Sequence, residues 1–331
     1  MSVYLDDRWI GPHGIGRFAS EVSHRCGFTP LGMTGQPLSL LDPWMLNQAL
    51  AKRKPGHFFS PGFNAPLGRP CSFSLTIHDL IHLEVADETS VVKRLYYRWI
   101  VLPALHRADV VFTVSEYSRQ KIAEWSGLES DRIVVAGNGV SELFSPEGEH
   151  WHWHKPYLLY VGNQKPHKNV EGLVKAYADS QLSEEVDLLL TGQFSESVAR
   201  VVTESGITSK VKSLGLIPEI DLPKLYRGAF ALAIPSRYEG FGLPLVEAMA
   251  SGVPVLSSDR TSLPEIGGGA VAYFNPDQHE TMVEGLNALM DESHRSRLRA
   301  SGLVRAQGFR WESVAQRVSD AIHARIGANK A

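Results

Sequence analysis

The sequence predicts an α/β protein built from parallel sheets with helices packed on their faces. Short apolar runs rich in β-branched residues alternate along the chain with longer stretches of helical periodicity. Such alternation is typical of βα units, in which a crossover helix joins two parallel strands. The chain also has 331 residues, a length that favours two domains. Hydrophobic residues make up 43% of it, which is ordinary for globular proteins and sufficient for two cores.

The expected strands fall into two sets with helices between them. Those of the first half are Val3–Leu5, Phe58–Ser60, Phe73–Ile77, Val110–Val114 and Ile133–Val135, and its clearest helices are Ser90–His106 and Ser115–Ser126. Those of the second half are Tyr157–Val161, Val186–Thr191, Val211–Leu214, Ala231–Ile234, Val253–Ser257 and Ala270–Tyr273. A last helical stretch, Trp311–Ile326, follows a sheet that is already complete, so it is available to pack back on the first domain.

A change of composition near residue 150 marks the expected domain boundary. The segment 145–156 holds two prolines, a glycine and several charges, as linkers between domains often do. We therefore expect two Rossmann-like domains, 1–150 and 151–310, with a helix at 311–327 completing the first. Inside the segment, the run Trp151-His152-Trp153-His154 suits a carbohydrate platform or a metal site, but hinge packing beside a surface loop is the favoured interpretation.

Bulk charge and hydropathy exclude several classes of protein. The formal net charge of −3 gives no global attraction to nucleic acid or to an anionic membrane, so any such contact must be a local patch. No apolar run approaches the roughly 18–20 residues of a membrane span, and no signal peptide is visible at the N-terminus. Cys26 and Cys71 lack a metal-binding spacing and predict buried, free thiols in a reducing compartment. The expected location is cytoplasmic, either soluble or peripheral at the inner face of the membrane.

The densest chemical signal is a glycine loop between a buried strand and a helix. The loop covers residues 239–242, and the helix begins near Pro244, a residue suited to a first helical turn. Glycines let the backbone approach a ligand, and the N–H groups at a helix start form an anion site suited to a pyrophosphate. Glu239 and Glu247 bracket this loop, and their carboxylates can accept hydrogen bonds from sugar or ribose hydroxyls.

Three other strand ends carry candidate binding residues, because α/β sheets bind ligands at the carboxyl ends of their strands. Lys165-Pro166-His167-Lys168 follows a strand of the second domain, where a lysine supplies a compact charge for a diphosphate. Gly11-Pro12-His13-Gly14-Ile15-Gly16-Arg17 follows the first strand and is weak evidence for phosphate binding by itself. His78 follows an apolar strand of the first domain, a position usually held by a satisfied loop histidine.

These segments together resemble the retaining GT-B glycosyltransferases of family 4, and the resemblance covers nearly the whole chain. The most specific part is the E-x7-E pattern of Glu239 and Glu247, supported by the basic motif that ends at Lys168. The resemblance implies a GT-B fold, in which two Rossmann-like domains face each other across a cleft. It also implies a nucleotide-sugar donor whose diphosphate is the leaving group.

The resemblance assigns roles to individual positions. Glu239 is expected to contact the donor sugar, Glu247 the nucleotide ribose and Lys168 the phosphates. His78 is expected beside the donor sugar, so His78, Lys168 and Glu239 are the predicted catalytic residues. Further donor contacts are expected from backbone or side-chain atoms of Gly14, Gly16, Asn163, Gly240, Phe241, Gly242 and Leu243.

Some positions stay open at this stage. Many members of the family have an arginine where this chain has Asn163, so either Lys165 supplies a second charge or only one is present. Arg17 is placed to touch donor phosphate, acceptor or solvent, and Arg17 and Ser115 are the candidates for the acceptor side. The stretch 93–99 mixes basic and aromatic residues; such a face can lie at a membrane interface, but a core-facing helix with solvated arginines is favoured.

The implied reaction transfers a hexose to a hydroxyl with retention at the anomeric carbon. No DxD motif occurs in a credible donor loop, so no metal and no other cofactor is expected. Similarity to bacterial surface-polysaccharide mannosyl- and rhamnosyltransferases points to GDP-mannose as donor. It also points to a glycan or polyprenyl-diphosphate-linked acceptor, as in O-antigen, lipopolysaccharide or exopolysaccharide biosynthesis. The alternatives are rhamnosyl or glucosyl transfer from another donor, a nucleotide-sugar epimerase of the same fold, and a non-catalytic nucleotide- or glycan-binding module.

Overall fold

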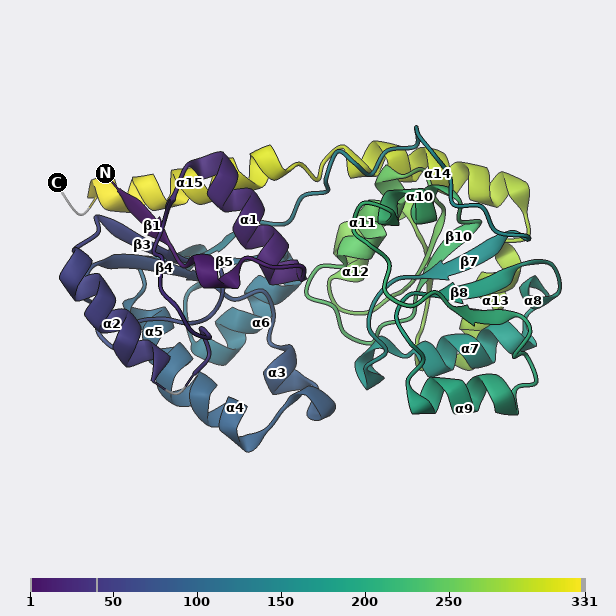
Figure 1. Ribbon diagram of the computed structural model, residues 1–331, viewed down its shortest axis with the longest axis horizontal. Helices are drawn as coiled ribbons and strands as arrows, with labels where there is room; N and C mark the ends of the chain where they lie inside the picture. Colours follow the sequence, from purple (N-terminus) through teal and green to yellow (C-terminus); the bar gives the residue numbers. More distant parts are fainter. Residues whose placement is uncertain (1, 40, 329–331) are drawn as a thin grey trace. The chain divides into compact units, whose positions relative to one another are not determined.

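The computed structural model describes residues 2–39 and 41–328 and divides into two compact units. The first unit is Met1–Gly139 with Arg310–Ala331, and the second is Val140–Phe309. The division falls at residue 140, whereas the sequence prediction places it at 150. In the described residues each unit holds a parallel six-stranded sheet between two helical layers (Figure 1), so the expected α/β class is confirmed.

The first sheet has the strand order β2-β1-β3-β4-β5-β6, and every pairing in it is parallel. The chain runs from β1 outward to β2 and then returns to the other side of β1, so the order reverses between β1 and β3. The two-residue edge strand β2 was not predicted, because its residues are exposed and carry no apolar pattern. The strands are β1 Val3–Leu5, β2 Thr29–Pro30, β3 His57–Ser60, β4 Ser72–Thr76, β5 Val110–Thr113 and β6 Ile133–Val135.

Helices cover both faces of this sheet. On one face α1 (Gly14–Cys26) packs beside the C-terminal helix α15 (Trp311–Ala328), with the rings of Phe18 and Trp311 6.5 Å apart (Figure 1). The other face carries α2 Asp42–Arg53, α4 Val91–Tyr96, the π-helix η3 Tyr97–Val101, α5 Leu102–Arg107 and α6 Glu116–Ser126. Short helical turns complete the unit: η1 Asp7–Trp9, α3 Ile81–Glu84, η2 Ala86–Glu88 and η4 Ser130–Arg132.

The second sheet has the order β12-β11-β10-β7-β8-β9, again with parallel pairings throughout. The chain moves from β7 outward to β9 and then crosses back to β10, so the order reverses between β7 and β10. In open α/β sheets a ligand crevice forms at such a reversal, at the carboxyl ends of the strands. The strands are β7 Tyr157–Tyr160, β8 Asp187–Leu190, β9 Val211–Ser213, β10 Ala231–Ile234, β11 Val255–Ser258 and β12 Ala272–Phe274.

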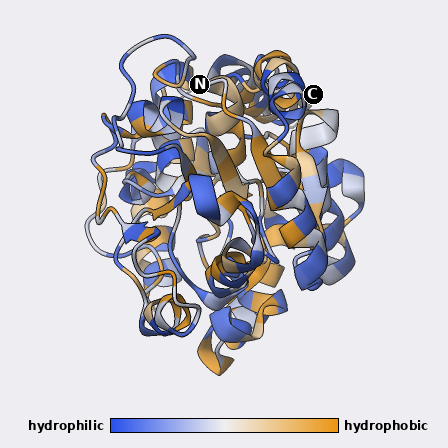
Figure 2. Ribbon diagram, turned by 90° about the vertical axis from the view of Figure 1, so that its right-hand side faces the viewer, coloured by the Kyte–Doolittle hydropathy of each residue, from blue (hydrophilic) through white to orange (hydrophobic). Residues whose placement is uncertain are grey.

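The second sheet is likewise sandwiched between helices. One layer has α7 Val170–Asp179, α8 Leu182–Glu185, α9 Glu196–Glu204 and α13 His279–Ala288. The other has α10 Leu222–Arg227, α11 Leu243–Ala250, α12 Leu263–Gly267 and α14 Glu292–Ala306, while η5 (Pro166–Lys168) and η6 (Gly268–Ala270) are short turns. Strands buried on both faces read as continuous apolar runs, and the strands are accordingly among the most hydrophobic ribbons of Figure 2.

The two cysteines lie in the first unit and are free, as predicted from their spacing. Cys26 and Cys71 are both half-buried, and burial raises the pKa of each thiol to about 11. Both thiols are therefore protonated and unreactive at neutral pH. Among the described residues, no helix combines the length and the hydropathy that crossing a membrane requires.

Candidate active site

Lys168 and Glu239 meet at the reversal of strand order in the second unit. Lys168 ends η5, just after β7, and Glu239 lies in the loop that follows β10. Lys168 Nζ is 2.7 Å from Glu239 Oε1, and the two side chains are 19% and 15% exposed. Because β7 and β10 are hydrogen-bonded neighbours, their following loops share the same edge of the sheet. The structure therefore brings these two predicted residues together, and their contact with a donor stays a prediction.

The carboxylate of Glu239 is held in place by its own loop and by the loop after β11. Ser236 Oγ donates to Glu239 Oε1 at 2.7 Å, so this oxygen receives both a hydroxyl and an ammonium. The backbone of Glu239 is fixed as well: its N–H donates to Thr261 Oγ1 at 3.0 Å, and its carbonyl accepts from Ser262 Oγ at 2.9 Å. Thr261 has a φ of 56°, a conformation that non-glycine residues adopt mainly where their surroundings enforce it.

The helix that follows this loop begins with its first-turn amides facing the loop. Gly242 precedes α11 with a φ of 93°, a backbone conformation that favours glycine. Among the described residues no side chain caps this helix. Its first-turn N–H groups and the positive end of its dipole therefore suit an anion. Phe241 is buried against the ring of Phe309, and contact of its backbone with a donor stays a prediction.

Glu247 lies inside α11 and is almost completely buried, with 3% of its surface exposed. Tyr226 of α10 donates its hydroxyl hydrogen to Glu247 Oε2 at 2.8 Å. The ring of Tyr226 is in turn packed edge-on against Phe144 at 5.6 Å. Glu247 is therefore oriented by a buried tyrosine, a partner that the spacing of the two glutamates does not reveal. Its predicted contact with a ribose stays a prediction.

The turn between β7 and η5 contains the departure from the family pattern, Asn163. Its side-chain Oδ1 accepts from the N–H of Lys165 at 3.3 Å, and its carbonyl accepts from the hydroxyl of Tyr160, so Asn163 shapes the turn. Lys165 and Arg237 both line a cavity of about 160 Å³ beside this turn. Either cation is thus placed to supply a second positive charge near the loop of Lys168.

His78 follows β4 in the first unit and is enclosed by its neighbours. Its Nε2 lies 2.9 Å from the carbonyl oxygen of Pro61, and the ring packs edge-on against Phe18 at 5.1 Å. Burial lowers the pKa of His78 to about 4. A carbonyl only accepts, so Nε2 carries the proton and Nδ1 of this neutral imidazole is an acceptor.

The glycine segment after β1 forms the first turn of α1. His13 Nδ1 accepts from the N–H of Gly16 at 2.9 Å and caps the helix. A Cβ on Gly16 would come within 2.3 Å of the carbonyl oxygen of Gly11, so this glycine permits close backbone packing. Gly14, at the start of the helix, is exposed, and Arg17 is half-buried. Donor or acceptor contacts at these positions stay predictions.

Ser115, expected on the acceptor side, has a structural role in the first unit. It is fully buried, and its Oγ accepts from the N–H of Ser118 at 3.1 Å as the N-cap of α6. Serine is among the preferred N-cap residues for this reason. The structure therefore places this side chain in the helix cap, and acceptor contact at Ser115 stays a prediction.

Two family models match consecutive parts of the chain. "Glycosyltransferase Family 4" matches residues 8–142, and "Glycosyl transferases group 1" matches residues 146–304. O-antigen chain mannosyltransferase B of Escherichia coli is 32% identical over 292 residues, which cover 83% of this chain and 76% of the relative.

The chain belongs to the family 4, group 1 glycosyltransferases.

A second relative agrees with this membership, and two solved structures share the fold. The glycosyltransferase is 30% identical over 232 residues to the serotype-specific mannosyltransferase WbdA of Escherichia coli, and this match covers 65% of the chain but 28% of WbdA. The crystal structure of WaaG, a glycosyltransferase involved in lipopolysaccharide biosynthesis, has a TM-score of 0.76 at 16% identity and covers 97% of this chain and 99% of its own. Anabaena HepE in complex with UDP and glucose has a TM-score of 0.76 at 15% identity, covering 98% and 100%. These likenesses confirm the GT-B fold; how the two units face each other stays a prediction.

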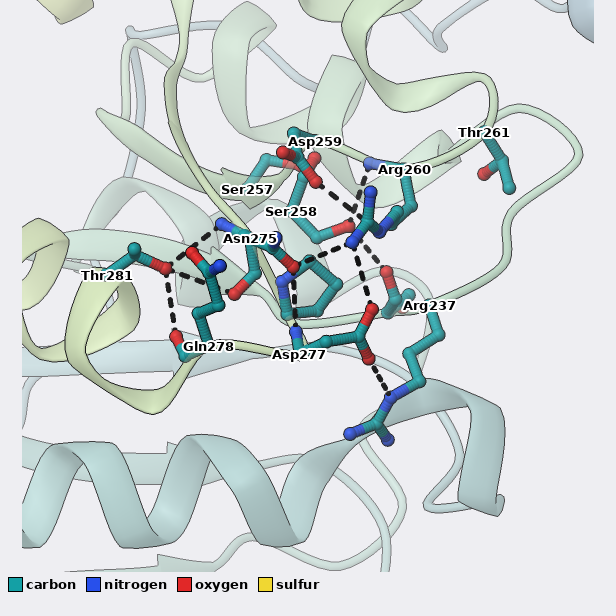
Figure 3. Close-up of polar contacts among 12 residues, drawn as sticks. Arg237, Ser257, Ser258, Asp259, Arg260, Thr261, Asn275, Asp277, Gln278 and Thr281 are labelled. Carbon is teal, nitrogen blue, oxygen red and sulfur yellow. Dashed lines mark hydrogen bonds and ion pairs between the residues drawn. The ribbon is translucent and has the colours of Figure 1, made fainter.

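The loops around the site of this glycosyltransferase are tied together by residues that were not predicted. Asp277, after β12, accepts from Arg237 Nε at 3.0 Å and from Arg260 Nη2 at 2.9 Å (Figure 3). Arg260 Nη2 also donates to Asn275 Oδ1 at 2.7 Å. The hydrogen bond from Arg237, assisted by Arg260, holds the pKa of Asp277 below its usual range. Ion pairs and hydrogen bonds thus connect the loops after β10, β11 and β12. The sequence feature that could have revealed this network is a polar residue after each of these strands.

A second unpredicted network lies at the strand reversal of the first unit. Arg8 donates to Asp6 Oδ2 at 2.6 Å and to Asp42 Oδ1 at 2.5 Å. Asn64 Nδ2 donates to the same two carboxylates at 2.8 and 3.1 Å, and its Oδ1 accepts from Trp9 Nε1 at 2.7 Å. Buried charges are stable when paired and hydrogen-bonded in this way. The network joins β1, β3 and the start of α2, so Asp6 and Asp42 have a structural role.

The Trp-His segment that was considered for a metal site makes contacts within the protein. Asp187 accepts from Trp153 Nε1 at 2.9 Å and lies 3.2 Å from His154 Nε2, so the Trp-His segment packs against the start of β8. In the part of the chain that the structure describes, no group of three or more His, Cys, Asp or Glu side chains is arranged to hold a metal ion.

Proposed function

We propose that this glycosyltransferase transfers a hexose, mannose in the first instance, from GDP-mannose to a glycan or lipid-linked glycan during synthesis of a bacterial surface polysaccharide. The observation that carries the proposal is the Lys168–Glu239 pair beside the uncapped start of α11. Mannose and O-antigen are supported by the names of the Escherichia coli relatives. The proposed place of action is the cytoplasmic side of the cell membrane.

The second unit supplies groups that can stabilise the negative charge of a departing diphosphate. Breaking the bond between the sugar C1 and the phosphate oxygen develops positive charge at C1 and negative charge on the diphosphate. Lys168 Nζ and the first-turn amides of α11 are placed to stabilise that negative charge where it appears. The proposal therefore assigns to a lysine and a helix start the role that a divalent metal has in other transferases.

Glu239 and Glu247 serve as hydroxyl acceptors in the proposal. Glu239 is pre-oriented by Ser236 and by the backbone contacts to Thr261 and Ser262, so its carboxylate is positioned before the donor arrives. That pre-organisation reduces the cost of orienting the sugar. Glu247, oriented by Tyr226, is assigned to the ribose. His78, neutral and with Nδ1 as an acceptor, is assigned to a sugar hydroxyl.

In the proposal, the acceptor hydroxyl attacks the sugar C1 from the same face that the diphosphate leaves. The configuration at the anomeric carbon is therefore retained. The C1–O bond to phosphate breaks, the C1–O bond to the acceptor oxygen forms, and the acceptor proton passes to an oxygen of the departing diphosphate. The donor is thus converted to a nucleoside diphosphate, and no protein carboxylate forms a covalent intermediate.

Nucleotide binding and turnover test this proposal together. Calorimetry against GDP, UDP and dTDP should show the tightest binding for GDP, and transfer from GDP-mannose should continue in EDTA. A strict requirement for a divalent metal contradicts the mechanism. Formation of an epimer or of free sugar without an acceptor indicates the nucleotide-sugar epimerase, and tight binding without any turnover indicates a binding module.

A further inference from the structure

The helix that begins at Val91 is apolar on two opposite faces. Tyr97, Val101 and Leu105 are buried in the core of the first unit. The other face exposes four large apolar side chains, with Trp99 66% exposed; they are Val91, Val92, Leu95 and Trp99. Their spacing of one, four and eight positions from Val91 places them along one side of a helix. The favoured sequence interpretation, a core-facing helix, therefore explains only half of this element.

A second group of exposed apolar side chains surrounds the start of α2. It consists of Leu38, Leu41, Trp44, Met45 and Leu67. Trp44 and Met45 border an open groove of about 780 Å³, which Met33 and Ala49 also line. Leu67 is held beside this helix start, because its N–H donates to the carbonyl of Pro43 at 3.0 Å.

The two groups of exposed side chains are connected through a series of packed and hydrogen-bonded side chains. Phe63 packs 6.3 Å from Tyr96 of α4 and 5.6 Å from Trp9. Trp9 in turn donates to Asn64, which donates to Asp42 at the first residue of α2. In Figure 1, α2 and α4 accordingly lie on the same side of the first sheet. We call the nine exposed side chains of the two groups the apolar face.

Large exposed apolar side chains are clustered in the apolar face. It holds nine of the 14 large apolar side chains that are exposed among the described residues. Single exposed apolar residues are normal on a soluble protein, but a cluster of them marks a surface that binds something.

The charge of this region is opposite in sign to that of the rest of the chain. Residues 38–108, which span the whole apolar face, contain eight lysines and arginines and five acidic residues, so their formal charge is 8 − 5 = +3. The whole chain carries −3, which leaves −3 − 3 = −6 for the remainder. Residues 89–108 contain no acidic residue, and Arg94 and Arg98 are exposed beside the apolar side chains. The guanidinium of Arg98 lies 5.7 Å from the ring of Trp99.

We propose that the apolar face docks the first unit on a bilayer surface that contains anionic phospholipid. Trp99 and Leu95 enter the boundary between headgroups and acyl chains, and Arg94 and Arg98 pair with lipid phosphates. Aromatic and aliphatic side chains combined with basic ones are typical of helices that lie in this boundary. A purely apolar partner surface leaves the positive charge unmatched, whereas an anionic bilayer matches both features. The docking goes beyond the proposed function, since it needs neither a donor nor a transfer reaction.

Vesicle flotation of the full chain tests the docking. One set of vesicles is phosphatidylcholine alone, and the other contains about 30 mol% phosphatidylglycerol. We expect binding to the anionic vesicles that weakens as salt is added, and little binding to the neutral ones. Leu95→Ser with Trp99→Ser should lower the partition coefficient at least about tenfold, because apolar burial is lost. Arg94→Gln with Arg98→Gln should lower it about tenfold on anionic vesicles, because two phosphate pairs are lost.

Matched substitutions in the second unit control for general effects. Val304 is 70% exposed and Arg297 is exposed, both on α14, so Val304→Ser and Arg297→Gln change similar side chains away from the apolar face. Both should bind vesicles like the unaltered protein, and all variants should retain its circular dichroism spectrum.

Three outcomes overturn the docking. The first is no flotation with either kind of vesicle, and the second is flotation that the four face substitutions leave unchanged. The third is a dimer by light scattering that Trp99→Ser dissociates without any vesicle binding, which would make the face an interface between two copies. GDP calorimetry on the same samples separates the proposals, because loss of nucleotide binding with intact flotation contradicts the proposed function and not the docking.

Discussion

Lys168 Nζ lies 2.7 Å from Glu239 Oε1, although the two residues are 71 positions apart in the sequence. The pair forms because β7 and β10 are neighbours at the point where the strand order of the second unit reverses. Its two members are partly exposed, so a donor can reach both. In the proposed reaction the ammonium of Lys168 faces the diphosphate and the carboxylate of Glu239 faces the sugar. Substitutions at the two positions should therefore have different effects on nucleotide binding and on turnover.

Replacing Lys168 by alanine should lower turnover about 10²–10³-fold, because one positive group aimed at the developing charge is lost. Affinity for GDP should fall as well, since the diphosphate remains in the product. Steady-state transfer kinetics and GDP calorimetry measure the two effects. Lys175→Ala is the matched control, because Lys175 is exposed on the neighbouring helix α7. Equal rates for the two variants would remove Lys168 from the mechanism.

Glu239→Gln should separate binding from turnover. The amide keeps the shape of the carboxylate but loses the charge that pairs with Lys168, so the lysine remains available for phosphate. We expect GDP affinity within about threefold of the original and turnover reduced about 10²-fold, as for other polar groups that act mainly in the transition state. The opposite pattern, weak GDP binding with normal turnover, contradicts the assignment of Glu239 to the sugar.

Tyr226→Phe should destabilise the second unit by about 1–3 kcal/mol. The substitution removes the hydroxyl that donates to Glu247 Oε2 and leaves a buried carboxylate short of a donor. Urea unfolding followed by circular dichroism measures the change. A variant as stable as the original would show that this hydrogen bond does not hold Glu247 in place.

Gly16→Ala should destabilise the first unit by about 1–3 kcal/mol, since its Cβ would come within 2.3 Å of the carbonyl oxygen of Gly11. Elsewhere in a helix the same substitution stabilises by about 1 kcal/mol, so the sign of the effect is decisive. Ser20→Ala, at an exposed position of the same helix, should be nearly neutral or slightly stabilising. Thermal unfolding of the three proteins distinguishes these outcomes, and a stabilised Gly16→Ala variant would contradict the packing described at this turn.

The contribution of His57 and His78 to the stability of the first unit should rise with pH between about 4 and about 6.5 and then level off. Burial lowers the pKa of both His57 and His78 to about 4 from an ordinary value of 6.5. In this window the unfolded chain binds protons that the folded unit does not, so folding is favoured as pH increases. His78→Gln should flatten part of this dependence and leave the part that belongs to His57.

Urea midpoints at about pH 5 and about pH 7 measure this effect in both proteins. An identical pH dependence with and without His78 would show that its imidazole is not held neutral by burial.

The sequence was sufficient for elements whose signal is local. The strands β6 and β10 have their predicted bounds, because each is a short apolar run with clear breaks on either side. The edge strand β2 lacked such a run, since Thr29 and Pro30 are exposed. The π-helix before Pro103 was also missed, because it depends on how the helix passes over the core and not on residue type alone.

In the candidate site, too, residues with a local sequence signal were predicted, and residues that depend on the folded structure were missed. Lys168 and Glu239 were predicted together because each follows a strand and because both match a family pattern. Thr261 and Ser262 were missed, since only the folded chain shows that the loop after β11 supports Glu239. The exposed apolar side of α4 was likewise hidden, because its residue pattern is compatible with either a core or a surface.

The anomeric configuration of the transferred sugar tests the central claim most directly. The protein is incubated in EDTA with GDP-α-mannose and a mannose-terminated oligosaccharide, and the product is examined by proton NMR. We expect a new α-linked mannose on the oligosaccharide together with free GDP. A β-linked product, or transfer that begins only when a divalent cation is added, would contradict this expectation.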